Sequence, residues 1–480
     1  MSILVIDAGT SGVRAAIVHP DATLGIERRR ATLPDSPFPG LVEFDAVAYA
    51  DAAISCALEV LAEHGPVDAV GISNQRASVV VWDAATGVPV APAQSWQDLR
   101  TIGDCLTLNA EGFHLAPTLS ATKLASILDS VDPDRTRDLR FGTIDSWIVW
   151  RLTAGAHHVA DRSNAGVWGL LDLDCTGPDL RLLERLRIPE TMLPTVVDSS
   201  GAIGEATALP GSPVICGIAG DQQSSLIGQA CVHPGMAKIT FGTGGMLDVF
   251  VGVERPAFRT RGEGGSYPLV CWQDAGTISW GVEAVMLSAG TNVEWLRDDL
   301  GLIPDSASSA EIAASVPDSD GVTYVPALLG LGAPRWDYGA RGSLLGLTRG
   351  TTGAHIVRAV LEGVAERGAD LVESAELDAG ISLGTLRIDG GMSANPVFVQ
   401  ALADATQRPI EVSPVLEATA LGAGFLAGLA IGTWSSWDDI AATWSPATAV
   451  EPGPATDRDR WRDAVDRSAE WISDLSALDF

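Results

Sequence analysis

Lysine is almost absent from this chain of 480 residues. Only Lys123 and Lys238 are present, and neither follows a glycine. The phosphate-binding loop of P-loop ATPases requires the sequence Gly-x-x-x-x-Gly-Lys-Ser/Thr, in which the lysine reaches the β- and γ-phosphates. The sequence therefore excludes a P-loop nucleotide site.

Positive charge as a whole is scarce. The 61 acidic residues outnumber the 31 basic residues and give a formal net charge of -30. A surface of this charge repels the phosphate backbone of nucleic acids and the headgroups of anionic lipids. We therefore expect neither a nucleic-acid partner nor a membrane partner.

Cysteine is infrequent, and its six residues are widely spaced. They form no Cys-x-x-Cys pair and no cluster with histidine at metal-ligand spacing, which favours buried apolar side chains in a reducing compartment. The run Met1–Asp7 lacks the basic region of a secretory signal. The longest apolar run, Leu421–Trp434, is too short to span a bilayer and indicates a buried helix. We expect a cytoplasmic protein.

Apolar residues are plentiful, at 46% of the chain, and their pattern alternates between strands and helices. The predicted helices cover residues 46–63, 143–152, 282–300 and 355–377, with two more that begin at Pro396 and Ala418. The predicted strands cover residues 67–73, 79–82, 213–218 and 385–388. This alternation is typical of α/β folds.

Two segments of the chain resemble each other. Ile6-Asp7-Ala8-Gly9-Thr10 returns as Ile239-Thr240-Phe241-Gly242-Thr243, and each segment predicts two strands joined by a glycine turn. The repeat predicts two α/β lobes with a cleft between them. Because Pro234-Gly235 offers a linker, we assign residues 1–232 to an N-terminal lobe and residues 233–480 to a C-terminal lobe.

The first hairpin carries a candidate phosphate site. The segment Asp7–Arg14 places a carboxylate at a strand end, then a turn of small residues, then an arginine. Backbone amides in such a turn can surround phosphate oxygens without a lysine. An ordinary glycine hairpin is the alternative, but it gains nothing from the acid Asp7, whereas a magnesium-nucleotide site needs an oxygen ligand there.

Two further acids follow predicted strands. Asp221 comes after Gly217-Ile218-Ala219-Gly220, where it could activate an alcohol as a general base or cap the helix that follows. Asp389 precedes Gly390-Gly391, whose missing side chains would let an adenine approach the backbone. A plain Gly-Gly turn is the structural alternative for the second segment.

Together these segments resemble the FGGY carbohydrate kinases, which share the actin and hexokinase fold, and within them the glycerol kinases. The similarity extends from Ile3 to about Trp434. The stretch 342–362 (GSLLGLTRGTTGAHIVRAVLE) satisfies the second signature of the family throughout. The first signature is poorer, because Thr122-Lys123-Leu124 is present but Ser126 replaces the expected tryptophan. The remaining similar segments are 71–76, 95–100, 217–223, 237–244, 330–342, 389–395 and 417–428.

The resemblance implies two actin/hexokinase-like (ribonuclease H-like) lobes with a nucleotide cleft between them, and a kinase that uses ATP and Mg²⁺. It implies that Asp7 and Asp221 frame the metal ion, and that Asp221 takes the proton of the attacking hydroxyl. The residues it implies for the nucleotide are Thr10, Ser11, Arg14, Gly242, Thr243, Gly391 and Asn395. Those it implies for the acceptor are Arg76, Trp96, Asp221, Gln222 and Met246.

The acceptor residues point to a polyol but depart from the glycerol kinase pattern. Asn74-Gln75-Arg76 is the glycerol kinase form of this strand, yet Ala77 stands where the family carries glutamate. Thr118 and Met246 stand where the family carries aromatic residues. Because each lost hydrogen-bond partner of a buried hydroxyl costs about 1 to 3 kcal/mol, we expect a larger polyol or sugar as acceptor. Glycerol itself, with these differences neutral, is the alternative.

Two other possibilities concern activity and regulation. A catalytically silent regulator on the same fold is disfavoured because Asp7 and Asp221 are retained. Many bacterial glycerol kinases, as the resemblance implies, bind fructose 1,6-bisphosphate across a subunit interface through a basic loop. The matching stretch here, Gly204–Ser212, has no lysine or arginine, so we expect no such inhibition. A homodimer or homotetramer formed by another surface stays possible.

Overall fold

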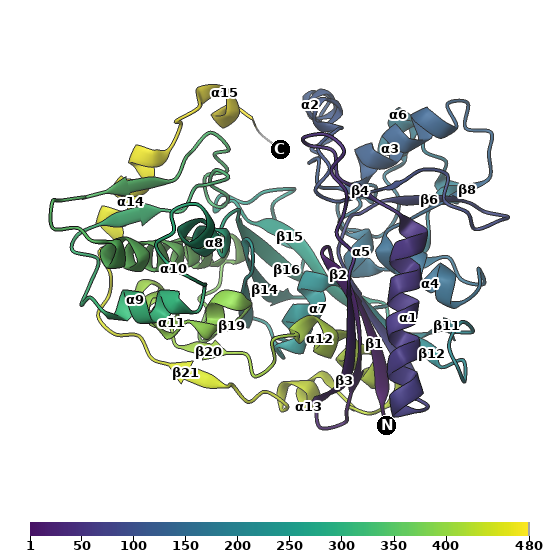
Figure 1. Cartoon of the computed structure of the whole chain (residues 1–480). Coiled ribbons are helices and arrows are strands. Elements are labelled where there is room, and N and C mark those ends of the chain that lie inside the picture. Colours follow the sequence, from purple (N-terminus) through teal and green to yellow (C-terminus); the bar gives the residue numbers. More distant parts are fainter. Residues whose placement is uncertain (479–480) are drawn as a thin grey trace.

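The computed structural model describes residues 1–478, which form two α/β lobes, each built on one large mixed sheet (Figure 1). The N-terminal sheet and its helices lie on the right in Figure 1, and the sheet formed after residue 236 lies to the left of it. This arrangement agrees with the predicted fold class.

A six-stranded sheet, in the order β11-β12-β5-β1-β2-β3, forms the centre of the first lobe. Its strands are β1 (Ile3–Ala8), β2 (Gly12–Val18), β3 (Leu24–Ala31), β5 (Ala69–Asn74), β11 (Ser200–Glu205) and β12 (Val214–Gly220). Strands β1, β5 and β12 are mutually parallel, and their register aligns Asp7 with Ser73 and Asn74 with Gly220. The residues that follow these strands therefore meet at one edge of the sheet.

A seven-stranded sheet, in the order β15-β16-β14-β13-β19-β20-β21, forms the second lobe. Its strands are β13 (Ala237–Phe241), β14 (Gly245–Gly252), β15 (Tyr267–Asp274), β16 (Thr277–Met286), β19 (Leu386–Asp389), β20 (Ile410–Val412) and β21 (Thr448–Val450). Strands β13 and β14 form an antiparallel hairpin, as β1 and β2 do in the first lobe. The predicted repeat of the hairpin is therefore present.

The prediction of one helix over residues 282–300 is wrong. Strand β16 extends to Met286, and only α8 (Thr291–Asp298) is helical. Six successive residues of β16, from Ser279 to Ala284, are buried, so side chains on both faces of this strand are covered, and α10 packs against it. A strand covered on both faces has a continuous apolar run, which has no period of its own and resembles a buried helix in sequence.

Helix α12 (Ala418–Ile431) lies far along the chain but packs against the first sheet, beside α7 (Asp221–Gly228). Figure 1 shows both helices between the two lobes. A Cβ atom on Gly422 would lie 1.8 Å from the carbonyl oxygen of Ser224, so glycine permits the close approach of the two helices. The helix predicted from the apolar run is buried as expected, at the junction of the lobes.

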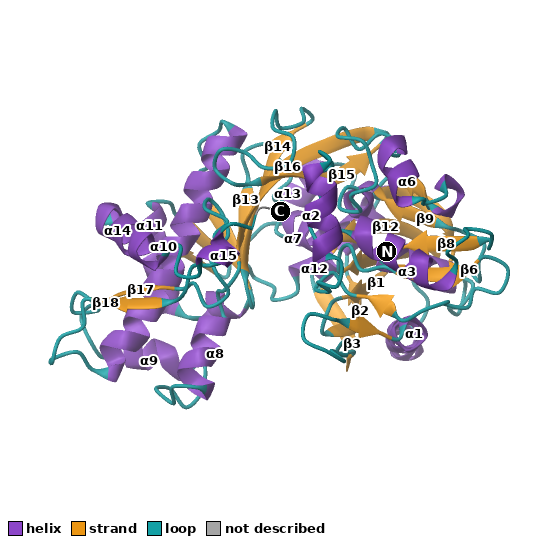
Figure 2. Ribbon diagram, turned by 90° about the horizontal axis from the view of Figure 1, so that it is seen from above, coloured by secondary structure: helices purple, strands orange, loops and turns teal. Residues whose placement is uncertain are grey.

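The other face of the first sheet is covered by α1 (Ala46–His64), which the sequence predicted over residues 46–63. In the second lobe, α10 (Gly353–Ala379) packs against α9 (Ser308–Ala314) and α11 (Pro396–Thr406). Figure 2 shows these helices and α14 (Arg458–Ser468) at the end of the second lobe away from the first.

Smaller elements complete the described chain. The additional helices are α2 (Ile102–Ala110), α3 (Ser120–Val131), α4 (Ile144–Leu152), α5 (Arg162–Ala165), α6 (Leu180–Leu186), α13 (Trp437–Ala441) and α15 (Ser473–Ser476), with 3₁₀ turns at Glu190–Met192 and Gly391–Ala394. The short strands are β4 (Glu43–Phe44), β6 (Val80–Asp83), β7 (Ala93–Gln94), β8 (Leu139–Gly142), β9 (Val159–Asp161), β10 (Thr195–Val197), β17 (Thr323–Val325) and β18 (Ser343–Leu345).

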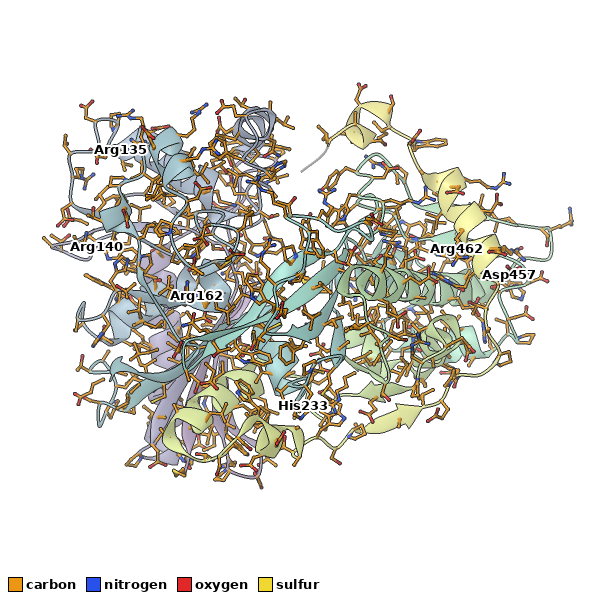
Figure 3. The ribbon with its side chains drawn as sticks, turned by 180° about the vertical axis from the view of Figure 1, so that it is seen from behind. Arg135, Arg140, Arg162, His233, Asp457 and Arg462 are labelled. Carbon is orange, nitrogen blue, oxygen red and sulfur yellow. The ribbon has the colours of Figure 1, made fainter. Side chains whose placement is uncertain are left out.

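Contacts between the lobes are polar as well as apolar. Arg162 of α5, labelled in Figure 3, donates from Nε to Oε1 of Gln273 on β15 at 2.6 Å. His233, also labelled in Figure 3, lies on the connection between the lobes. The six cysteines are buried and unpaired, as predicted. In the part of the chain that the structure describes, no helix is both long and apolar enough to cross a membrane.

Candidate active site

Asp7 lies at the end of β1, at the edge where the parallel strands of the first sheet finish. Its Oδ2 accepts a hydrogen bond of 2.9 Å from Oγ1 of Thr419, at the start of α12. Burial raises the pKa of Asp7 to about 6, against the opposing charge of Arg14. A cation bound beside Asp7 would stabilise the ionised form of this buried carboxylate.

Arg14 faces Asp7 across the hairpin, in the register of β1 and β2. The guanidinium is buried and forms ion pairs with Glu27 and with Glu417, which precedes α12. The arginine predicted for the nucleotide is therefore held in place by two carboxylates beside the predicted phosphate turn.

Thr10 and Ser11 form the tip of this hairpin. Ser11 is exposed and Thr10 is half-buried. Oγ1 of Thr10 accepts a hydrogen bond of 2.9 Å from Nε1 of Trp96. The hairpin predicted for the nucleotide and the tryptophan predicted for the acceptor are thus in direct contact.

Asp221 is the first residue of α7 and directly follows β12. Gly220, rather than Asp221, is the cap of this helix. The carboxylate is 28% exposed and accepts a hydrogen bond of 2.9 Å from its neighbour's backbone amide, that of Gln222. Burial raises the pKa of Asp221, while Arg76 lowers it. A partly accessible carboxylate with a raised pKa suits a general base.

Arg76 follows β5 and lies between two carboxylates. Its Nε is 3.6 Å from Oδ1 of Asp221, and its Nη2 donates to Oε2 of Glu283 at 2.7 Å. Nη1 of Arg76 is buried and has no hydrogen-bond partner among the described residues. Glu283 lies on β16 of the second lobe, where the sequence pattern predicted a helix, and it was therefore not among the predicted site residues.

Gln222 is fixed by the second lobe. Its Oε1 accepts a hydrogen bond of 2.6 Å from Nζ of Lys238 on β13. Lys238 also forms an ion pair of 2.7 Å with Asp248, and both side chains are fully buried. Met246 lies on the same hairpin, half-buried, opposite Thr240 and next to β16.

Gly242 and Thr243 form the turn between β13 and β14, as the repeat predicts. Gly290, which the sequence analysis missed, donates its backbone amide to the carbonyl of Gly242 at 2.8 Å, and Ala289 donates to that of Thr243 at 2.8 Å. A Cβ atom on Gly290 would lie 2.6 Å from the oxygen of Gly242, so only glycine fits against this turn.

The two glycines after β19 differ in their surroundings. Gly390 has a φ of 86°, and an added Cβ would lie 2.4 Å from the oxygen of Phe241. Gly391 is exposed, and an added Cβ would meet no atom within 4 Å. The close packing thus belongs to Gly390, while Gly391 leaves open space of the kind an adenine requires.

Asn395 caps α11, since its Oδ1 accepts hydrogen bonds from the backbone amides of Val397 and Phe398. Its Nδ2 donates to Oγ of Ser309 at 3.0 Å. Both ends of the amide are engaged in the second lobe. A nucleotide that contacted this side chain would compete with these hydrogen bonds. The nucleotide contact of Asn395 therefore stays a prediction, while the structure gives this residue a role as a helix cap.

Asp7 and Asp221 fit a magnesium ion that other groups help to coordinate. Within residues 1–478, no group of three or more His, Cys, Asp or Glu side chains is arranged to hold a metal ion by itself. Asp7 accepts one side-chain hydrogen bond, so its second oxygen is available. Magnesium at phosphotransfer sites commonly uses one or two carboxylates together with phosphate oxygens and water.

Comparisons with known proteins bear on this site. The models for the N-terminal and C-terminal domains of the FGGY family of carbohydrate kinases match residues 2–228 and 237–431. A glycerol kinase of Aromatoleum aromaticum is 40% identical over 496 residues, which cover 98% of this chain and 99% of that protein. A glycerol kinase of Halorhodospira halophila is 42% identical over 496 residues, with 98% and 97% covered. The crystal structure of Plasmodium falciparum glycerol kinase with ADP gives a TM-score of 0.89 at 28% identity, with 100% and 99% covered.

Proposed function

The chain belongs to the FGGY family of carbohydrate kinases, and we propose that within this family it transfers the γ-phosphoryl group of ATP to a hydroxyl of glycerol. Membership confirms the predicted family, fold and enzyme class: the protein is an ATP-dependent phosphotransferase that acts on an alcohol group and uses ATP with Mg²⁺.

The observation that carries the acceptor proposal is the placement of Asp221 beside Arg76. A glycerol hydroxyl beside this pair can donate its proton to the carboxylate, and the guanidinium of Arg76 supplies positive charge and hydrogen-bond donors next to it. Gln222, which accepts a hydrogen bond from Lys238, and Trp96, which donates one to Thr10, are held in fixed positions. Fixed groups of this kind position the attacking oxygen and reduce the entropic cost of the reaction.

Phosphoryl transfer requires positioning and charge neutralisation more than covalent chemistry. Asp221 removes the proton as the hydroxyl oxygen attacks the γ-phosphorus. Asp7 and Asp221 would hold magnesium, which neutralises charge on the phosphates. The turn at Thr10 and Ser11 offers amides and hydroxyls to the same phosphates, and the turn at Gly242 and Thr243 mirrors it in the second lobe.

A longer polyol or sugar is the second candidate acceptor. Ala77 and Met246 favour it, because they are smaller or less polar than the residues that the family pattern carries at these positions. Glycerol is favoured by relatives that are 40 to 42% identical over almost the whole chain. The carboxylate of Glu283, which is paired with Arg76, also provides a negatively charged hydrogen-bond acceptor near the place where Ala77 replaces the glutamate of the family pattern.

A panel of acceptors tests this proposal. ADP release from ATP and Mg²⁺ is measured with glycerol, a four-carbon polyol, five-carbon polyols and ketoses, with Asp221→Asn as the inactive control. The highest kcat/KM for glycerol supports the proposal. A higher value for a longer polyol supports the second candidate, and no stimulation by any acceptor would indicate a silent nucleotide-binding protein.

Assembly, location and domain division remain predictions. A cytoplasmic location is tested by cell fractionation, and a homodimer or homotetramer by analytical ultracentrifugation. The predicted division between residues 232 and 233 lies between the two ranges matched by the family models.

A further inference from the structure

The ion pair between Arg76 and Glu283 joins the two lobes at the proposed acceptor site. Arg76 follows β5 of the first sheet, and Glu283 lies within β16 of the second. Their side chains are 14% and 12% exposed, and Nη2 donates to Oε2 at 2.7 Å. No other ion pair of Glu283 is formed within the described residues.

We propose that Glu283 is a positioning residue for acceptor recognition: it holds Arg76 away from Asp221, so that the arginine binds an acceptor hydroxyl and the carboxylate stays available as the base. The inference rests on the proposed function. It adds a residue of the second lobe to a set of acceptor residues drawn mainly from the first.

Geometry supports this division of roles. The hydrogen bond of Arg76 goes to Glu283, whereas the distance from its Nε to Asp221 is 3.6 Å, beyond a good hydrogen bond. Without Glu283, Asp221 would be the remaining ion-pair partner of this buried guanidinium among the described residues. An unpaired buried charge is energetically costly, so Arg76 would then hydrogen-bond to Asp221. It would compete with the acceptor hydroxyl for that carboxylate.

The surrounding strands make Glu283 a rigid support. Strand β16 is hydrogen-bonded to β14 on one side and β15 on the other, and Glu283 is aligned with Asp248 and Tyr267. A carboxylate on a central strand is placed more accurately than one on a loop. The first lobe has no carboxylate at Ala77, directly after Arg76, so the carboxylate that hydrogen-bonds to this arginine comes from the second lobe.

The alternative is that the ion pair of Arg76 and Glu283 only stabilises the contact between the lobes and has no part in acceptor binding. Glu366 and Arg458 provide a control outside the site, because their side chains are 13% and 15% exposed and form an ion pair within the second lobe, where Arg458 also pairs with Asp370 and Glu373. Glu366 lies on α10 and Arg458 is the first residue of α14, at the end of the second lobe marked by Asp457 and Arg462 in Figure 3.

Steady-state kinetics of Glu283→Gln and Glu366→Gln, with acceptor and ATP varied separately, tests the inference. For Glu283→Gln we expect the acceptor KM to rise about tenfold, with the ATP KM within about twofold of the wild type. Glu366→Gln should leave both KM values unchanged. If Glu283→Gln lowers the melting temperature but leaves the acceptor KM unchanged, the ion pair of Arg76 and Glu283 only stabilises the structure and the inference is wrong.

A second variant separates recognition from folding. Introducing Ala77→Glu into Glu283→Gln returns a carboxylate to the residue next to Arg76, and it should lower the acceptor KM again. If the acceptor KM of the double variant is as high as that of Glu283→Gln or higher, the inference is contradicted. An inactive wild type would instead refute the proposed function, and with it the inference, so the two failures are distinguishable.

Discussion

Nε of Arg76 lies 3.6 Å from Oδ1 of Asp221, while Nη2 of the same arginine is 2.7 Å from Glu283. The arginine is therefore close enough to influence Asp221 electrostatically but hydrogen-bonds to the other carboxylate. Burial raises the pKa of Asp221 and Arg76 opposes this. The carboxylate keeps the proton affinity that a base needs and remains partly exposed to its substrate.

Replacing Asp221 by Asn should remove the base with little change in shape. We expect kcat to fall by about 10² to 10⁴, the range for loss of a general base. Isothermal titration with ADP should show nucleotide binding in the variant, because the turns at Thr10 and Gly242 are untouched. Wild-type turnover in Asp221→Asn would exclude this residue as the base.

Ala77 is the position where this chain departs from the family pattern beside Arg76. Its side chain is buried. Its φ of 60° lies in the left-handed region, where glutamate and alanine have a similar conformational strain. We expect Ala77→Glu to raise kcat/KM for glycerol relative to five-carbon polyols by about 5- to 20-fold, through one added hydrogen bond.

Ala77→Gln is the matched control for this prediction, because it has the same length without the charge. Both variants are compared with the wild type on glycerol and on a five-carbon polyol. An equal change in Ala77→Gln would show that size, and not the carboxylate, sets the preference.

The order of the elements in the fold was predictable wherever local patterns decide it. The hairpin at Asp7 and the helix 355–377 were found because turn residues and a period of 3.6 residues mark them. Strand β16 was missed because its buried run has no period. The packing of α12 on the first sheet depends on contacts between Gly422 and Ser224, almost 200 positions apart, which no local pattern contains.

The candidate site was predictable where a functional residue lies at the end of a strand, beside a turn that contains glycine. Asp7 and Asp221 meet this condition, and the structure places them at one edge of the first sheet. Glu283 and Gly290 do not, because their relation to Arg76 and Gly242 arises only when the strands pair. The side chain of Asn395 illustrates the reverse case, since a polar residue before proline can be a helix cap.

Asp145 should make the protein less stable as the pH rises. It is fully buried next to Asp161, and burial raises its pKa to about 7. Because the folded pKa lies above the unfolded value near 3.8, the full contribution to stability is present below about pH 4 and is lost as the pH rises through about 7.

The variant Asp145→Asn mimics the protonated acid and keeps its size. Between pH 5 and pH 8, its melting temperature should fall less than that of the wild type, by an amount equivalent to on the order of a few kcal/mol. The exposed acid Asp104, replaced by Asn, serves as control and should follow the wild type. Parallel curves for all three proteins would show that Asp145 does not titrate in this range.

The segment Gly204–Ser212 should not bind a bisphosphorylated sugar. It has no lysine or arginine, and its backbone offers no substitute, because the amides of Ala206, Ala208, Leu209 and Ser212 all donate to carbonyl groups of the first lobe. A phosphate site without cations needs several free amides that point to one place. We expect fructose 1,6-bisphosphate to leave the initial rate unchanged at fixed ATP and Mg²⁺, while ADP, as the product, inhibits and shows that the assay responds. A saturable loss of rate that disappears when residues of this segment are replaced would contradict the prediction, whereas a loss that survives those replacements would place the inhibitor on another surface.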